Sequence, residues 1–290
     1  MEIIETLING LSSGGTYAMI ALGYTMVYGI AKMLNFAHGD IIMVGGYMIF
    51  VTMTAVGSPI IGLVAAIIFC TLLGIVIEKI AYKPLRGASP LAVLITAIGV
   101  SYLLQSTAQI IFGTSPKMVI ISDLGNIEIG SLKVPMYTVV TLVCSFTIMI
   151  ILSLFVKYTK TGRAMIAVSE DRGAAQLMGI NVNGIITLTF AIGSAMAAFA
   201  GFFMLMKSPS LSNTLGAMPG IKAFTAAVIG GIGSIPGAML GGILMGVVEA
   251  ISFKIPVIAP YTDAIEFLIL IIILLVRPSG ILGKVRREKV

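Results

Sequence analysis

Long runs of apolar residues, separated by short polar or glycine- and proline-containing stretches, recur along the whole chain. Many of these runs approach the roughly 20 residues that an α-helix needs to cross the hydrocarbon core of a bilayer. Because backbone amides and carbonyls must find partners within the lipid, the runs predict helices. The predicted spans, by residue number, are 7–31, 40–56, 59–80, 91–112, 135–156, 185–207, 221–234, 236–252 and 260–276.

The number of crossings depends on two of these segments. Residues 221–234 and 236–252 are both short for a full crossing, and Gly233-Ser-Ile-Pro236-Gly predicts a turn between them. They form either two crossings or one glycine-rich, broken or re-entrant hairpin. The sequence thus predicts an all-α, polytopic integral membrane protein with about eight or nine transmembrane helices. We expect residues 1–290 to form a single transmembrane domain.

Basic residues indicate the orientation of the chain. They gather in 79–90, in 157–183 and in the tail 277–290, which predicts that these segments are cytoplasmic. Two predicted spans separate the first two segments, in agreement with this assignment. Counting back places the N-terminus outside, and 113–134 becomes an external loop with glycine and proline turns. The expected location is the inner membrane of a bacterium.

Composition narrows the class of protein. Hydrophobic residues make up 58% of the chain, charged residues 10%, and the mean hydropathy is +1.09, which excludes an ordinary soluble domain. The net charge of +6 comes from basic residues spread over loops, so positive-inside topology explains it better than a nucleic-acid partner. Cys70 and Cys144 lie in apolar runs and are expected to be buried, inert thiols.

The polar stretch 157–183 is the longest interruption of the apolar pattern, and it contains a predicted short helix. Asp171 is suited to the N-cap, and Gly179 to the left-handed stop. A loop has no core to bury the small and apolar side chains of this helix, so we interpret it as a docking helix. Its docking residues are predicted to be Ala174, Ala175, Leu177 and Met178, with Arg163 and Arg172 at the rim.

Sequence signatures of catalysis are missing. The chain has no Gly-x-x-x-x-Gly-Lys-Ser/Thr phosphate loop, so no ATPase of its own is predicted. One histidine and few acidic residues support neither a metal site nor a nucleophilic triad. We therefore expect a chain that is not an enzyme and binds no cofactor itself.

Two segments are candidates for a transport pathway. In 34–40, Asn35, His38 and Asp40 are costly at membrane depth unless they face protein or water. They form either a capped turn, with Asp40 as N-cap of the next helix, or a gate in which Asn35 and His38 join helices by hydrogen bonds. The second segment is the glycine-rich one; its candidate pathway residues are Thr225, Gly230, Gly231 and Gly233.

Four more charged residues lie in the last apolar segments. Glu249, Lys254, Asp263 and Glu266 are predicted near the outer ends of their spans, so Glu249 and Glu266 are weaker pathway candidates. Glycines 237, 241 and 242 are explained by close helix packing.

Four blocks carry a family resemblance: Gly-Tyr-Thr-Met-Val-Tyr-Gly at 23–29, Leu-Asn-Phe-Ala-His-Gly-Asp at 34–40, Ile-Lys-Ala-Phe-Thr-Ala-Ala-Val-Ile-Gly-Gly-Ile-Gly-Ser-Ile-Pro-Gly-Ala at 221–238 and Arg-Pro-Ser-Gly-Ile-Leu-Gly at 277–283. Together they resemble the LivH-type permease subunits of branched-chain amino acid ABC importers. The resemblance covers essentially the whole chain. It implies a second, homologous permease of the LivM type, two cytoplasmic ATPases that hold ATP and Mg, and an external substrate-binding protein.

The stretch 157–183 also resembles the coupling loop of ABC permeases, whose general pattern is Glu-Ala-Ala-x-x-x-Gly. Ala174, Ala175 and Gly179 fit this pattern, whereas Gly173 stands in the place of the glutamate. Glu170 and Asp171 lie just upstream, and Asp171 is our choice for the acidic role. The resemblance thus predicts import of branched-chain amino acids, driven through this loop by partner ATPases. The alternatives are a related importer for urea or short amides, or a stand-alone channel or secondary transporter.

Overall fold

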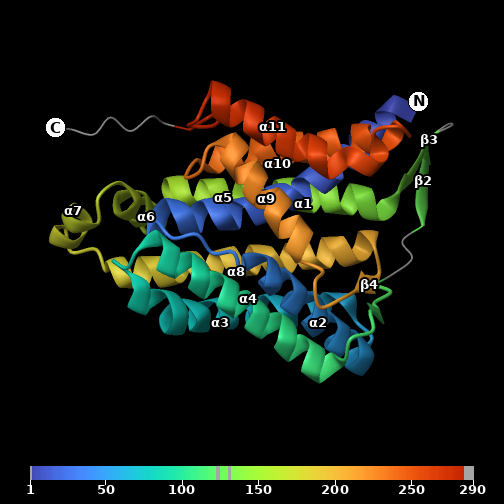
Figure 1. Cartoon of the computed structure of the whole chain (residues 1–290). Helices are drawn as coiled ribbons and strands as arrows, with labels where there is room; N and C mark the ends of the chain where they lie inside the picture. The colour runs from blue at the N-terminus through green and yellow to red at the C-terminus, as the bar shows by residue number, and fades with distance from the viewer. Residues whose placement is uncertain (1, 122–124, 130–131, 284–290) are drawn as a thin grey trace.

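The computed structural model describes residues 2–121, 125–129 and 132–283, and its helices form an elongated bundle (Figure 1). The α-helices are α1 (Glu2–Ala31), α2 (His38–Val56), α3 (Pro59–Ile77), α4 (Pro90–Phe112), α5 (Met136–Tyr158), α6 (Lys160–Glu170), α7 (Arg172–Leu177), α8 (Val182–Lys207), α9 (Ala217–Gly230), α10 (Ile235–Lys254) and α11 (Thr262–Val276). A π-helical turn, η1 (Glu78–Tyr82), and two 3-10 turns, η2 (Lys83–Leu85) and η3 (Ala259–Tyr261), extend or precede them.

Seven of the described helices are long and apolar enough to cross a membrane. They are α2, α3 with its extension to Leu85, α4, α5, α8, α10 and α11 with η3. The 30-residue α1 and the 14-residue α9 lie in the same bundle. The chain is therefore an all-α, multi-pass membrane protein, and its helix boundaries follow the predicted spans closely.

The two ends of the bundle differ. α6, α7 and the described C-terminal end of the chain lie at one end, and the N-terminus lies at the other, with β2 and β3 (Figure 1). The small strands are β1 (Lys117–Met118), β2 (Asn126–Ile129), β3 (Leu132–Pro135) and β4 (Ser210–Leu211). β2 pairs with β3 and β1 with β4, both antiparallel. The loop predicted as turns alone thus contains short strands.

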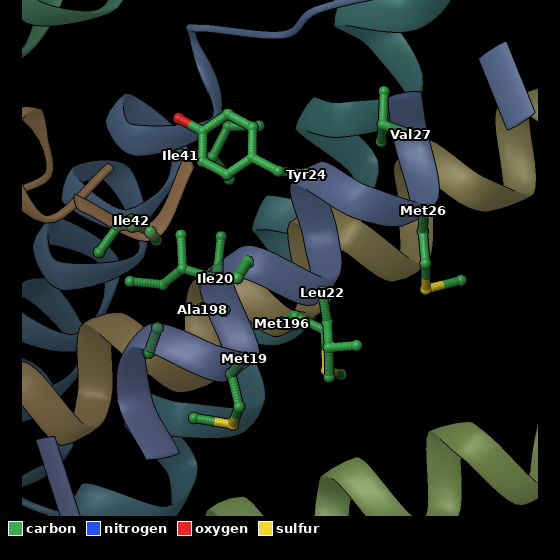
Figure 2. Close-up of a cluster of buried hydrophobic side chains, with 14 of the residues drawn as sticks. Met19, Ile20, Leu22, Tyr24, Met26, Val27, Ile41, Ile42, Met196 and Ala198 are labelled. Carbon is green, nitrogen blue, oxygen red and sulfur yellow. The ribbon is translucent and has the colours of Figure 1, made fainter. Parts of the chain in front are cut away.

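The central helix is α1, which packs against α5, α8, α9 and α10. Figure 2 shows Ile20 and Tyr24 of α1 on the side of Ile41 and Ile42, while Leu22 points away from them. Ile20, Leu22, Ile41 and Ile42 are fully buried. An α1 that is covered on several sides explains how it can carry polar residues such as Thr16 and Thr25 without exposing them to lipid.

Close packing between α1 and α10 depends on glycine. A Cβ atom on Gly242 would overlap the backbone of Ala18, and one on Gly246 would overlap Gly14. Helix axes approach this closely only where side chains are missing. The prediction that Gly242 serves helix packing is confirmed.

The glycine-rich turn after α9 lies at the α6–α7 end of the bundle. A Cβ atom on Gly29, two residues before the end of α1, would lie 3.2 Å from the Cα atom of Gly233. The chain after α11 packs on the same turn: the amides of Ile281 and Leu282 donate to the carbonyls of Ile229 and Gly230, at 2.8 and 2.9 Å. Of the predicted tail 277–290, residues 284–290 lie outside the described residues.

Candidate functional site

Two helices begin inside the bundle instead of at its surface. After α1 ends, residues 32–37 run back along the bundle before α2 starts (Figure 1). A Cβ atom on Gly23 would overlap the ring of His38, the first residue of α2. Since Gly23 precedes the end of α1 by eight residues, α2 begins about 12 Å inside that end. Helix ends inside the spanning region leave backbone groups free, a feature that many transporters have.

The start of α9 meets the start of α2 there. Gly216 precedes α9, and a Cβ atom on it would overlap the carbonyl of Gly39; a Cβ atom on Gly220 would lie 3.1 Å from the Cα atom of Gly39. We call this contact of Gly39, Gly216 and Gly220 the interior junction. Residues 212–216, before α9, are non-helical, so α9 starts after an irregular segment.

Aromatic rings surround the interior junction. Tyr24 lies edge-on to His38, with 4.8 Å between the ring centroids, and edge-on to Phe224 at 5.8 Å. Phe36 contacts Phe224 at 5.4 Å. The gap beside these rings, next to Asn35, has no room for a water molecule. The structure is therefore closed at this point, between the interior junction and the α6–α7 end.

Asn35, His38 and Asp40 are all buried, but their roles differ from each other. The hydroxyl of Tyr82, in η1, donates to Asn35 Oδ1 at 2.8 Å, so Asn35 joins two elements as predicted. His38 Nε2 has no hydrogen-bond partner among the described residues, and its ring packs on Tyr24 instead. The N-cap prediction for Asp40 is wrong: α2 already begins at His38, and the Asp40 carboxylate accepts from Gln105 Nε2 at 2.8 Å.

The glycine-rich candidates are not part of the interior junction. Gly230, Gly231 and Gly233 form the turn that packs on residues 277–283, at the α6–α7 end. Thr225 is buried within α9. α9 and α10 pack on one another and are joined by the turn at 231–234; α10 has 20 residues, whereas the 14-residue α9 starts in the interior after an irregular segment.

A cluster of ions lies between α9, α10 and α11, in which Lys222, Glu249 and Glu266 are buried and Asp263 is half exposed. Lys222 Nζ lies 3.2 Å from Glu249, 2.7 Å from Asp263 and 3.1 Å from Glu266. The hydroxyl of Tyr17, in α1, donates to Glu249 at 3.0 Å. These four charged residues, Lys222, Glu249, Asp263 and Glu266, are called the ion cluster below. Among the described residues, no group of three or more His, Cys, Asp or Glu side chains is arranged to hold a metal ion.

The stretch 157–183 folds into two helices rather than the one predicted. Thr159 Oγ1 accepts from the amide of Gly162 at 2.9 Å and caps α6, which the sequence reasoning missed. Asp171 Oδ1 accepts from the amide of Ala174 at 3.0 Å and caps α7 as predicted. Gly179 has a φ of +79°, the left-handed conformation expected after a helix end.

The side chains of α7 face two ways. Leu177 is 90% exposed and Met178 82% exposed, and Ala174 is exposed beside them. Residues at i, i+3 and i+4 share one helix face, which explains why these three project together. Ala175 is only 4% exposed and packs inward, so its predicted docking role is corrected. The exposed residues Arg163, Glu170, Asp171, Ala174, Leu177, Met178 and Gly179 are called the coupling surface below.

Arg172 connects α7 to the central helix instead of lying at the rim. Its guanidinium donates to the carbonyl of Ile30 at 3.0 Å and to that of Ala31. Partial burial and the nearby Arg86 both lower the pKa of Arg172. Arg86 in turn pairs with the fully buried Glu78 and donates to Asn183, at the start of α8. The base of the coupling surface is therefore anchored to α1, and the adjoining end of α8 is tied to the loop after α3.

A family model described as "Branched-chain amino acid transport system / permease component" matches residues 6–274. The chain belongs to this family. This permease is 43% identical to the high-affinity branched-chain amino acid transport system permease protein BraD of Pseudomonas aeruginosa, over 99% of this chain and 98% of that protein. It is 41% identical to the corresponding LivH of Escherichia coli, over 100% and 98%. A more distant relative is the ribose import permease protein RbsC of Haemophilus influenzae. The two are 26% identical over 84% of this chain and 76% of RbsC.

The ion cluster is the feature of this permease that sequence reasoning missed. From the sequence, Lys222 is named only within the family block 221–238. Glu249, Asp263 and Glu266 are placed near the outer ends of their spans, and no ion pair between them and Lys222 is predicted. Charged residues within apolar segments are rare and usually pair with one another. Applied to Lys222 and Glu249, which lie 27 positions apart in neighbouring apolar segments, this rule predicts an ion pair.

Proposed function

We propose that this permease carries branched-chain amino acids across the bacterial inner membrane as one subunit of an ABC importer. The observation that carries the proposal is the full-length identity, above 40%, with two proteins named for high-affinity branched-chain amino acid transport. The same names favour amino acids over urea or short amides as the substrate. The match to a ribose import permease supports a scaffold that does not fix the substrate by itself.

The proposed partners supply what this chain lacks. A second, homologous permease of the LivM type completes the conduit with this chain's single domain, residues 1–290. Two cytoplasmic ATPases bind ATP and Mg, and an external protein captures the substrate. The missing phosphate-binding pattern in this chain supports nucleotide sites on other subunits.

The proposed orientation places the α6–α7 end and the C-terminus in the cytoplasm and the N-terminus outside. The four basic residues of 157–183, which are Lys157, Lys160, Arg163 and Arg172, support this choice, since short cytoplasmic loops accumulate Lys and Arg.

The coupling surface is proposed to dock in a groove of an ATPase. Leu177 and Met178 expose a large apolar area at the tip of a polar segment, and burying such side chains contributes about 1.5–3 kcal/mol each. Arg163 and Glu170 of α6 and Asp171 before α7 add exposed polar groups to the same segment, which suits a protein interface with an apolar centre and a polar rim. Movement of an ATPase would then pull α7, and Arg172 would pass the movement to α1.

The interior junction is proposed as the gate. Asn35 lines the closed gap and accepts a hydrogen bond from Tyr82, and His38 is the residue before Gly39 of the interior junction. Asp40, in the first turn of α2, accepts a hydrogen bond from Gln105 of α4. Two helices whose starts touch through glycine can separate without breaking the hydrogen bonds within either helix. A shift of α1 would move Tyr24, whose ring packs on both His38 and Phe224.

Competition for uptake tests the substrate. The permease, reconstituted with its partner subunits and binding protein, should take up labelled leucine, and excess isoleucine or valine should suppress that uptake. Urea and acetamide at the same excess should have no effect. Suppression by urea or acetamide, with none by valine, would assign this permease to the other substrate class.

A further inference from the structure

A polar cavity opens at the β2–β3 end of the bundle, opposite the coupling surface. Its volume is about 300 Å³, and it lies between α1, α5, the end of α8 and α10. Pockets for small molecules begin at about this size. The wall residues that matter here are Glu5, Ser13, Lys207, Glu249, Ala250 and Phe253.

Two carboxylates, Glu5 and Glu249, and two lysines, Lys207 and Lys254, line the cavity. Glu249 belongs to the ion cluster, in which one ammonium group, that of Lys222, faces three carboxylates. Glu249 is also the member of that cluster that lines the cavity. Two of these carboxylates, Glu249 and Glu266, are buried beside that one ammonium group, so a further cationic group at Glu249 would be bound favourably. Glu249 is 8% exposed. Because it lines the cavity, a ligand in the cavity could reach its carboxylate.

The remaining walls provide a cation and an apolar surface. Lys207, the last residue of α8, is exposed, and its Nζ donates to Ser13 Oγ at 2.9 Å. Phe253 and Ala250 of α10 add apolar contacts on the same side as Glu249. A carboxylate held by Lys207 and an ammonium held by Glu249 are the two charges of one α-amino acid. The apolar side chain of such a ligand would rest on Phe253.

We propose that this cavity is an entry site for an aliphatic α-amino acid, with the ammonium group at Glu249 and the carboxylate at Lys207. The site rests on the proposed function, because only an importer would receive its substrate at this end. It lies on the opposite side of the interior junction from the closed gap beside Asn35. An amino acid bound in the cavity would therefore lie on the outer side of the interior junction.

Protection of a cysteine against labelling tests the site directly. The Ala250→Cys variant, with Cys144→Ala to lower background labelling, is assembled into the complete transporter in liposomes without ATP. A membrane-impermeant methanethiosulfonate reagent then labels it from outside. Leucine at about four times its Kd should slow labelling about fivefold. 4-Methylpentanoate, which lacks the ammonium group, and 3-methylbutylamine, which lacks the carboxylate, should protect much less.

The control is Val56→Cys, which is exposed at the end of α2 outside the cavity. Its labelling should not respond to leucine. Unchanged labelling of Ala250→Cys, or equal protection of both variants, would overturn the site. The two analogues distinguish recognition of both charges from simple filling of the cavity, and equal protection by either one also counts against the assignment.

Kinetics give the second test. Glu249→Gln should raise the KM for leucine uptake about tenfold or more, because a charge-assisted hydrogen bond is lost. Glu128→Gln, the same change in an exposed ion pair on the β2–β3 hairpin, should leave the KM unchanged. If Glu249→Gln does not assemble, Ala250→Cys still decides. A wild-type transporter that takes up no leucine refutes the proposed function, whereas normal uptake with an unchanged KM in Glu249→Gln refutes only the entry site.

Discussion

Arg172 of α7 donates a hydrogen bond of 3.0 Å to the carbonyl oxygen of Ile30, in the last turn of α1. The last carbonyls of a helix have no partner within it, so the guanidinium caps α1 and attaches α7 to it. α1 packs on α5, α8, α9 and α10, and it carries Tyr24 beside the interior junction. One side chain thus links the coupling surface to the helix at the centre of the bundle.

Replacing this link should separate ATP hydrolysis from transport. Arg172→Met keeps much of the apolar stem but removes the donors to α1, so leucine uptake should fall about tenfold, a typical size for coupling between two sites. ATP hydrolysis by the assembled transporter should continue. Uptake and hydrolysis measured on the same liposomes check this. Arg163→Met, at an exposed position of α6, is the control and should have a smaller effect on the ratio; a normal ratio in Arg172→Met would contradict the link.

The end of α7 depends on a left-handed glycine. Gly179→Val forces a β-branched side chain into a φ of +79°, which costs on the order of 1–3 kcal/mol and should disorder the tip that carries Leu177 and Met178. Proteolysis of the loop in the assembled protein should accelerate. Gly173→Ala, in the same helix at an ordinary φ, should be as resistant as the wild type. Equal proteolysis of all three proteins would show that the cap does not hold this tip.

The interior junction should tolerate no side chain. In Gly216→Ala the new methyl group would overlap the carbonyl of Gly39, so the free energy of unfolding should fall by about 1–3 kcal/mol or more. Thermal unfolding in detergent measures this. Gly99→Ala in α4 meets nothing within 4 Å and should be neutral or slightly stabilising. Equal melting temperatures for the two variants would contradict the close contact between the starts of α2 and α9.

The ion cluster should be sensitive to loss of its cation. Lys222→Met leaves three carboxylates without their ammonium partner, and removing one partner of a buried ion pair typically costs about 3–5 kcal/mol. The double variant Lys222→Met with Glu266→Gln should recover part of this stability, because it also removes a buried charge. Lys133→Met breaks an exposed pair and should cost less than about 1 kcal/mol. Thermal unfolding of the three variants measures these differences. A Lys222→Met variant as stable as the wild type would contradict the ion cluster.

The sequence predicted well what depends on local chemistry. Apolar runs are long enough to define helices without knowledge of their neighbours, so the helix boundaries agree with the predicted spans within a few residues. Asp171 and Gly179 were identified from capping preferences that act within one turn, and both have the predicted geometry. Gly242 followed from the packing rule for small residues.

The misses concern contacts between distant segments. The tail residue Leu282 donates to the carbonyl of Gly230 from some 50 positions later in the chain, and only the tertiary fold brings the two together. The side chain of Arg172 reaches α1 across 142 positions, and Ala175 is buried by the same packing. Asp40 lies in the first turn of α2. The sequence does not distinguish an aspartate that caps this helix from one that accepts a hydrogen bond from Gln105 of α4.

In the proposed function, this chain is a passive conduit that separate ATPases move through the coupling surface. The most direct measurement is ATP-dependent leucine uptake by the complete transporter with Leu177→Asp, beside liposomes that hold the purified chain alone. Placing a carboxylate in the apolar centre of the coupling surface should abolish uptake while the variant still inserts in the membrane, and the chain alone should move no leucine. Undiminished uptake by Leu177→Asp, or leucine transport by the chain alone, would contradict the account.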